Sequence, residues 1–410
     1  MRRKKSILMA ALVMAAASMM ACTNAPQGET IVIEGELANV PDSLVIELYE
    51  YDGNAGNRIA RDTVMDGKFR FEVETEIEGV HSASIDNFDI GLQTYSFLWI
   101  EPGANIRITG DGLDYSAWQI ESNVAAQKTE NQFREAVQAE RSQLHRIDME
   151  HAPLMQRYEG GRDGKQRPSD EERKQMQARL RELRSQQSSI NMQLIDKEEA
   201  LLDTETPDEA WMERLYRISL KFKITRDTVA RARGIQLYDR MDERLKASYR
   251  GQSIANNLFP PQVVTVGRML PEDIELKDTL GNVHHLQELR GKYLLLDFWF
   301  SGCGPCIESF PEMREISEQM ADSLEVISIS QDSEKEWRRA SARHGITWYN
   351  WNDLQRENGI FAHFGIRNIP HYFLISPEGK IIATDIGYSK GSLFKFVKKT
   401  IAEHNKQKEP

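Results

Sequence analysis

The sequence predicts an α+β protein of several domains, with an N-terminal antiparallel β-sandwich, a central helical hairpin or bundle, and a C-terminal α/β domain. Three observations support this division. Apolar residues alternate with period two through residues 30–112, and they recur in steps of three and four between 122 and 202. At 294–300 they form a run interrupted by Asp297, shortly before a pair of cysteines. These patterns are typical of half-buried strands, amphipathic helices and a fully buried strand, respectively.

The composition is that of a globular protein and excludes several classes of function. The chain has 410 residues, enough for two or three domains, and its 40% hydrophobic and 28% charged residues exclude an integral protein with many membrane spans. Its net charge of -11 gives no sign of a nucleic-acid surface, so we expect no nucleic-acid partner. Three cysteines are too few for a disulfide scaffold or a four-cysteine zinc site.

Residues 1–21 have the organisation of a secretory signal peptide. A basic start precedes a short apolar run, and the small residue Ala21 stands directly before Cys22. The segment that ends in Cys22 resembles the lipobox of bacterial lipoproteins, so we expect cleavage there, lipidation of the cysteine and a flexible tether over 22–29. The alternative is an ordinary signal peptide with an incidental cysteine. Either form implies export, and we expect a lipid-anchored protein of the cell envelope that faces the periplasm.

Short alternating strands fill residues 30–115. Turn signals such as Asp66-Gly67 separate segments in which every second residue is apolar. We therefore expect an antiparallel β-sandwich or small barrel. No cluster of histidines, cysteines or paired carboxylates in this segment indicates a site, so we expect a structural or partner-binding module.

Residues 116–259 predict a helical region that contains an antiparallel hairpin. Apolar stripes at 133–158 and 176–194 flank a glycine-rich break at 160–164. Such stripes are more often the seam between two helices than a surface for a partner, but both interpretations remain open.

Capping signals locate the helix that follows the break. Ser169, followed by Glu172, predicts a capping box at its start. Further helices are expected at 207–222 and 228–250, before a new pattern begins near residue 263.

The motif that points to chemistry lies directly after the apolar run at 294–300. Cys303-Gly304-Pro305-Cys306 opens a segment with a helical pattern. Two thiols at this spacing can close a small disulfide ring, and a helix N-terminus stabilises a thiolate on the first of them. We therefore expect Cys303 to attack a substrate and Cys306 to resolve the product.

Other interpretations of the cysteine pair are half of a zinc site or a purely structural disulfide. A zinc site needs further ligands, and the remaining cysteine is Cys22 at the predicted anchor. Covalent haem attachment is excluded because no histidine follows Cys306. We expect neither a metal nor a cofactor.

The segment resembles the active site of the thioredoxin superfamily. Asp297 stands six residues before Cys303 and matches the buried acid that accepts a proton in thioredoxins. Pro370 matches the cis-proline that packs against the disulfide, in a loop that resembles the family's. The resemblance implies catalytic roles for Cys303, Cys306, Asp297 and Pro370, and supporting roles for Trp299, Gly304, Pro305 and Ile369.

The spacing within the last domain, 263–402, indicates a branch of this superfamily. Sixty-four residues separate Cys306 from Pro370, and the stretch includes a predicted strand at 324–329 and a helix at 334–344. This arrangement resembles the membrane-anchored TlpA/ResA-like oxidoreductases, and implies a thioredoxin-like α/β fold. The upstream strands resemble a domain of unknown function that precedes such modules in Bacteroidetes lipoproteins.

Two positions depart from the family pattern. Gly302 stands where thioredoxins carry a tryptophan, and this removes an aromatic platform for docking and leaves the substrate preference open. His371 follows the proline and either tunes the nearby thiolate or packs in the fold.

The resemblance implies a membrane-anchored thiol:disulfide oxidoreductase. The Gly304-Pro305 pair resembles that of reducing thioredoxins, so we expect a reductase of apocytochromes or other exported proteins with disulfides. Its partners would be those proteins, an unidentified electron donor, and the membrane through the lipid. The alternatives are a peroxiredoxin-like peroxidase, an envelope adaptor with a secondary redox domain, and copper delivery through the two cysteines with His363 or His371.

Overall fold

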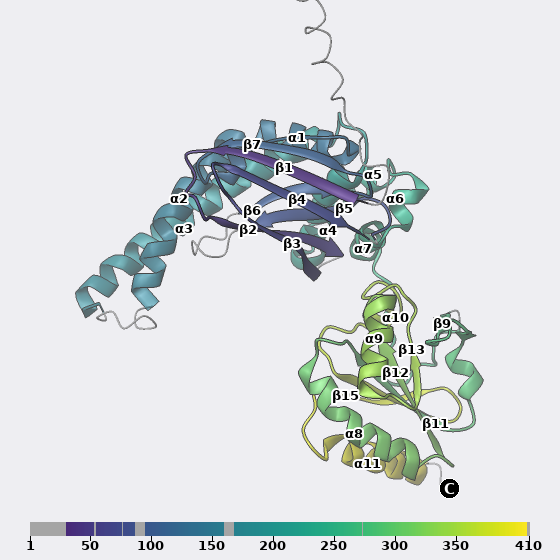
Figure 1. Ribbon diagram of the computed structural model, residues 1–410. Coiled ribbons are helices and arrows are strands. Elements are labelled where there is room, and N and C mark those ends of the chain that lie inside the picture. The colour runs from purple at the N-terminus through teal and green to yellow at the C-terminus, as the bar shows by residue number, and fades with distance from the viewer. Residues whose placement is uncertain are drawn as a thin grey trace, which may run out of the picture. The chain divides into compact units, whose positions relative to one another are not determined.

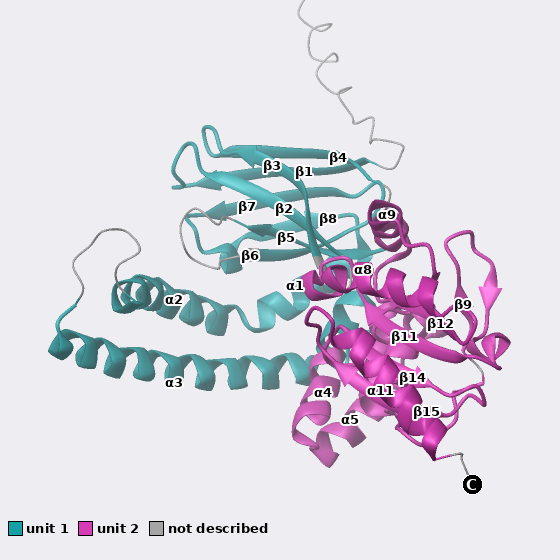
Figure 2. Ribbon diagram, turned by 90° about the horizontal axis from the view of Figure 1, so that it is seen from below, with its two compact units in different colours: residues 1–215 teal, residues 216–410 magenta. Residues whose placement is uncertain are grey.

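The protein divides into two compact units between Leu215 and Tyr216 (Figure 2). The computed structural model describes residues 30–52, 55–75, 77–86, 95–159, 168–272 and 274–407. Cys22 and the predicted signal and tether therefore lie outside the described residues. Across the ranges that are described, no helix is long and apolar enough to span a membrane. The division falls inside a helix, whereas the sequence placed the last boundary between 259 and 263.

Two four-stranded sheets form the first part of unit 1 (Figure 1). One has the order β4-β1-β7-β8, with bounds Lys68–Glu74, Thr30–Ala38, Asn105–Asp111 and Gln119–Ser122. The other has the order β3-β2-β5-β6, with bounds Ala55–Thr63, Val45–Asp52, His81–Asp86 and Tyr95–Ile100. Apolar residues of both sheets, such as Ile33 and Ile85, share one core, and this explains the period-two pattern.

The expectation of a fully antiparallel sandwich is wrong in one pair of strands. β1 pairs with β7 in parallel, with Ile33 opposite Ile106. A parallel pair needs a long connection, and here the five intervening strands supply it.

The predicted helical hairpin consists of α2 (Gln138–Glu159) and α3 (Asp170–Leu201), which lie side by side (Figure 1). Ser169 and Glu172 form the predicted capping box, and this prediction is confirmed. The first stripe does not belong to one helix, because the helical conformation is interrupted at Val137. Phe133 therefore lies in the separate helix α1 (Ala125–Ala136), which packs beside β6 and β8. The glycine-rich break at 160–164 is outside the described residues.

The helix expected at 228–250 is three helices. After α4 (Glu209–Thr225), which spans the division between the units, the chain forms α5, α6 and α7 at Thr228–Tyr238, Glu243–Ala247 and Tyr249–Leu258. Asp242 and Ser248 cause the breaks, because their side chains accept hydrogen bonds from Leu245 N–H and Gly251 N–H and thereby start new helices.

A five-stranded sheet with the order β13-β12-β11-β14-β15 is the centre of unit 2. The bounds in that order are Tyr349–Trp351, Leu324–Ser330, Tyr293–Trp299, His371–Ile375 and Ile381–Ile386. β11, β12 and β13 pair in parallel, whereas β14 pairs antiparallel with both of its neighbours, β11 and β15. Every residue of the central strand β11 is buried, which explains why apolar residues occupy it on both sides of Asp297. A small hairpin of β9 (Leu276–Lys277) and β10 (Val283–His284) precedes the sheet.

Helices cover the sheet of unit 2 and create two apolar cores. One core contains Phe310 of α8 (Gly304–Gln319) and Val397 of α11 (Ser392–Lys406), and these two helices lie side by side (Figure 1). The other contains Phe361 of α10 (Ile360–His363). The predicted helix between β12 and β13 is α9 (Glu334–His344), with the bounds the sequence indicated.

Candidate active site

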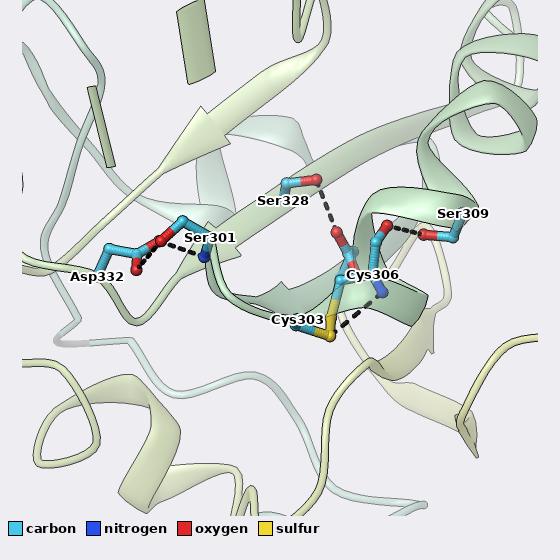
Figure 3. Close-up of a disulfide and its surroundings, with 7 residues drawn as sticks. Ser301, Cys303, Cys306, Ser309, Ser328 and Asp332 are labelled. Atoms are coloured by element: carbon cyan, nitrogen blue, oxygen red, sulfur yellow. Dashed lines mark hydrogen bonds between the residues drawn. A yellow bond between two sulfur atoms is a disulfide. The ribbon is translucent and has the colours of Figure 1, made fainter. Parts of the chain in front are cut away.

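The two cysteines of the motif form a disulfide at the start of α8 (Figure 3). Cys303 is the N-cap residue, and its Sγ accepts a hydrogen bond of 3.2 Å from the backbone N–H of Cys306. This N–H belongs to the first turn, where helix amides have no partner within the helix. In the reduced protein the same group and the helix dipole favour a thiolate on Cys303.

The cysteines differ in their access to a substrate. Cys303 retains 6% of its accessible surface, whereas Cys306 retains none. Gly304 and Pro305 are exposed between them in the first turn, where a proline costs no hydrogen bond. Of the two cysteines, Cys303 is therefore the one that presents surface to a substrate disulfide.

Asp297 faces the core that contains this disulfide. Side chains alternate along a strand, and Leu295 and Trp299 of β11 both belong to the core of Cys303 and Cys306. Asp297 lies between them in the alternation and is fully buried. It is therefore a carboxyl group on the apolar face beside the cysteine pair.

One hydroxyl partners this carboxyl group. The Ser328 hydroxyl donates a hydrogen bond of 2.9 Å to Oδ2 of Asp297, from the opposite position on β12. Burial raises the pKa of Asp297 to about 7, although the hydrogen bond from Ser328 lowers it. A carboxyl that titrates near neutral pH can act as a general base or acid for the cysteines.

The Ile369-Pro370 peptide bond is cis and lies directly before β14. Ile369 packs against the core that contains both cysteines. Trp299 is fully buried, with its ring centroid 5.2 Å from that of Phe310 on α8. Around one core the structure thus gathers the disulfide, the buried acid, Trp299 and the residue before the cis-proline.

His371 is not brought to the disulfide. Its ring lies 4.5 Å from that of Phe373, which belongs to the core on the other face of the sheet. Its Nε2 lies 2.6 Å from the Thr384 hydroxyl, and burial lowers its pKa. Of its two predicted roles the geometry supports packing. Within the described part of the chain, no group of three or more His, Cys, Asp or Glu side chains could hold a metal.

A carboxylate anchors the loop that leads to Cys303. Asp332 accepts hydrogen bonds from the N–H and the hydroxyl of Ser301, at 2.8 and 2.9 Å (Figure 3). The Ser330 hydroxyl donates to the same carboxylate at 2.9 Å. Burial raises the pKa of Asp332 above its ordinary value because it disfavours the charged carboxylate. The hydrogen bonds from Ser301 and Ser330 partly offset this effect by stabilising the charged form. This role of Asp332 could not be predicted from the sequence, because Ser301 lies 31 residues away.

Phe300 presents an aromatic surface next to the cysteine motif. Its side chain is 37% exposed, although it ends a run that the sequence predicts to be buried. An added Cβ at Gly302 would lie 2.6 Å from a ring atom of Phe300, so the missing side chain at 302 makes room for this ring. Phe300, two residues earlier, thus places an aromatic ring beside Gly302.

Comparison with known proteins places these residues in a recognised domain. The family model named Redoxin matches residues 265–400. The thioredoxin-like protein YneN of Bacillus subtilis is 29% identical over 34% of this chain and 82% of its own. The thiol-disulfide oxidoreductase ResA of Geobacillus thermodenitrificans is 30% identical over 32% of this chain and 75% of its own.

A solved structure aligns with a similar share of this chain. The thioredoxin domain of a thiol-disulfide oxidoreductase from Bacteroides vulgatus aligns with 33% of this chain and 97% of its own, at 29% identity and a TM-score of 0.30. The Redoxin match begins at residue 265, and the resemblance of residues 30–115 to a domain of unknown function stays a prediction.

Proposed function

Since the chain belongs to the thioredoxin-like thiol-disulfide oxidoreductases through residues 265–400, we propose that it reduces disulfides of exported proteins from a membrane anchor. One observation carries the proposal. The Sγ of Cys303 accepts a hydrogen bond from the first turn of α8, in the same core as a buried acid that titrates near neutrality. This arrangement supplies both a nucleophile and a proton acceptor.

The reaction is a two-electron exchange of disulfides. The Cys303 thiolate attacks one sulfur of the substrate disulfide, and the other substrate sulfur leaves as a thiolate that takes a proton from water. Asp297 then accepts the proton of the Cys306 thiol, and Cys306 attacks the Sγ of Cys303. The ring disulfide forms, the second substrate sulfur leaves as a thiolate that takes the proton from Asp297, and two electrons have passed to the substrate. An external dithiol donor reduces the pair again.

Reduction of insulin disulfides tests the activity. With dithiothreitol as the donor, the full chain should accelerate insulin reduction, and Cys303→Ser should remove the acceleration. Because Ser309 is buried on α8 and its hydroxyl donates to Cys306 O, Ser309→Ala is a control for general disturbance of the helix. Equal activity of wild type and Cys303→Ser would overturn the proposal.

The reductive direction has its own test. The Gly304-Pro305 pair, which resembles that of reducing thioredoxins, supports a low potential. We expect the reduction potential of the pair to lie near that of thioredoxin, about -270 mV, in equilibrium with a glutathione or dithiothreitol buffer. A value near that of the oxidant DsbA, about -120 mV, would show that the protein oxidises its substrates.

The anchor rests on the sequence around Cys22. A basic start, an apolar run and a small residue before the cysteine support export and lipidation. Cells given a labelled fatty acid should incorporate it into the wild-type protein and not into Cys22→Ser. Equal labelling of both proteins would contradict the proposed anchor.

A further inference from the structure

Three polar side chains meet inside the otherwise apolar core beside the disulfide. The Trp348 indole N–H donates a hydrogen bond of 2.8 Å to the Ser328 Oγ. The Ser328 hydroxyl donates in turn to Oδ2 of Asp297 at 2.9 Å. Trp348 belongs to the same core cluster as Cys303 and Cys306 (Figure 3 shows Ser328 and the cysteines).

The chemistry of these groups fixes the direction of both hydrogen bonds, which together form a hydrogen-bond chain from Trp348 through Ser328 to Asp297. An indole nitrogen can only donate, so the Ser328 oxygen must be the acceptor from Trp348. The single hydroxyl proton of Ser328 is then free to point only at Asp297. Oδ1 of Asp297, by contrast, is buried and has no hydrogen-bond partner.

We propose that Trp348 and Ser328 are positioning residues that hold a hydrogen bond on Oδ2 of Asp297 and leave Oδ1 as the oxygen that exchanges a proton with the cysteines. The proposal deepens the proposed function and rests on the role of Asp297 as the base. A proton cannot pass along the chain, because the indole N–H at its end has no lone pair to accept one. Proton exchange must therefore use the free oxygen.

Burial is the largest influence on the charge of Asp297, and among the polar groups around it the Ser328 hydroxyl is the one that donates to it. From β14, Tyr372 stands opposite Asp297, and burial together with the Asp297 charge raises its pKa, so its phenol stays neutral. The disulfide at the start of α8 does not titrate. Glu312 of α8 accepts hydrogen bonds from Gly391 N–H and Phe394 N–H. From α9 and α11 the same core receives the apolar side chains of Trp337 and Val397.

The test is the titration of Asp297 in the oxidised full chain, followed by the infrared band of the protonated carboxyl group and assigned by its loss in Asp297→Asn. A hydrogen bond to a carboxylate favours its charged form. Ser328→Ala should therefore move the midpoint upward by about one pH unit. Trp348→Phe should move it in the same direction by less, because it only frees the hydroxyl to turn.

Two matched controls come from the same unit. Trp337 is another buried tryptophan, but its indole N–H donates to Asn350, so Trp337→Phe removes an equivalent group without touching the chain. Ser341 is a buried serine whose hydroxyl donates to Trp337 O, and Ser341→Ala matches Ser328→Ala. Both controls should leave the midpoint in place. Midpoints in Ser328→Ala and Trp348→Phe that equal those of the controls would overturn the proposal.

A second readout separates this proposal from the proposed function. In single-turnover reduction of insulin, the pH profile of the Cys306 step should shift upward in Ser328→Ala with the infrared midpoint. A shifted infrared midpoint without any insulin reduction by wild type would overturn the proposed function while leaving the effect of the chain on Asp297 in place. A shifted infrared midpoint with an unshifted rate profile would overturn the assignment of the chain to catalysis.

Discussion

Asp297 combines a buried carboxyl group with a single donor, and this has a consequence for stability. Burial, the larger influence, raises its pKa from 3.8 to about 7. Between these values the unfolded chain is ionised while the fold keeps the carboxyl protonated. The contribution to the free energy of unfolding is therefore complete below about pH 4 and is lost as the pH rises from about 4 to about 7.

The variant Asp297→Asn should remove this pH dependence. Its free energy of unfolding should exceed that of the wild type by up to about 4 kcal/mol at pH 8, relative to the difference at pH 4. Denaturant unfolding of the oxidised full chain, followed by tryptophan fluorescence at both pH values, measures the change. The same variant should slow the release of the mixed disulfide. A stability difference that does not change with pH would contradict the raised pKa.

We predict that Phe300, which is exposed beside Gly302, contacts a protein substrate that approaches Cys303. Phe300→Ala should raise the KM for insulin about 5-fold, which corresponds to about 1 kcal/mol for the loss of one aromatic contact. The rate with a small aliphatic disulfide should not change. Gly302→Ala should act in the same direction, because the added Cβ displaces the Phe300 ring.

Tyr349→Ala provides the control for these variants, because Tyr349 is similarly exposed, at 39%, but lies on the edge strand β13. An equal rise in KM for Tyr349→Ala would show that a docking role for Phe300 is wrong.

At the scale of the element, the start of α8 depends on the loop before it. Asp332→Ala removes the acceptor of three hydrogen bonds to Ser301 and Ser330. The cost should be about 1–3 kcal/mol of stability, and the alkylation rate of reduced Cys303 should fall about 10-fold as its position at the helix N-terminus becomes less defined. Iodoacetamide labelling of the reduced protein at several pH values measures this.

Asp353 offers a matched control for Asp332. Its carboxylate accepts hydrogen bonds from Ile360 N–H and Gln355 N–H in the loop before α10, on the other face of the sheet. Asp353→Ala should lose comparable stability but leave the alkylation rate of Cys303 unchanged. If both variants slow alkylation equally, the effect arises from general loosening of unit 2.

Elements that follow a local pattern could be predicted from the sequence. The buried run of β11, the helix α9 and the capping box at Ser169 all depend on residues close together in the chain. The breaks at Val137, Asp242 and Ser248 could not, because a helical pattern continues through them. At Asp242 and Ser248, a side-chain cap starts the next helix.

The same distinction applies to the site. The cysteine motif is local, and Asp297 lies six residues before it, so the sequence and the family resemblance locate both. Ser328 lies opposite Asp297 because of the register between β11 and β12. Trp348 lies in a loop 20 residues after Ser328 and donates its hydrogen bond to Ser328. The sequence around a serine in an apolar strand does not show which residue will lie opposite it on the neighbouring strand.

At the scale of the whole molecule, we predict that a loss of stability in unit 1 leaves the chemistry of unit 2 unchanged. In unit 1, Arg214 lies buried between Glu130 and Glu198, with N–O distances of 2.9 and 3.3 Å. Arg214→Ala leaves two buried carboxylates without this partner and should cost unit 1 about 3–5 kcal/mol. Insulin reduction at temperatures below the unfolding transition should remain that of the wild type. Loss of reduction while unit 2 stays folded would show that the redox chemistry needs unit 1.

Capture of a mixed disulfide identifies the cysteine that attacks the substrate. The full chain with Cys306→Ala keeps the attacking cysteine and lacks the resolving one, so an oxidised protein substrate should remain covalently bound. We predict that non-reducing electrophoresis of this variant with insulin shows an adduct and that mass spectrometry locates the bond at Cys303. No adduct in Cys306→Ala, or the same adduct in a variant that lacks Cys303 as well, would contradict the account.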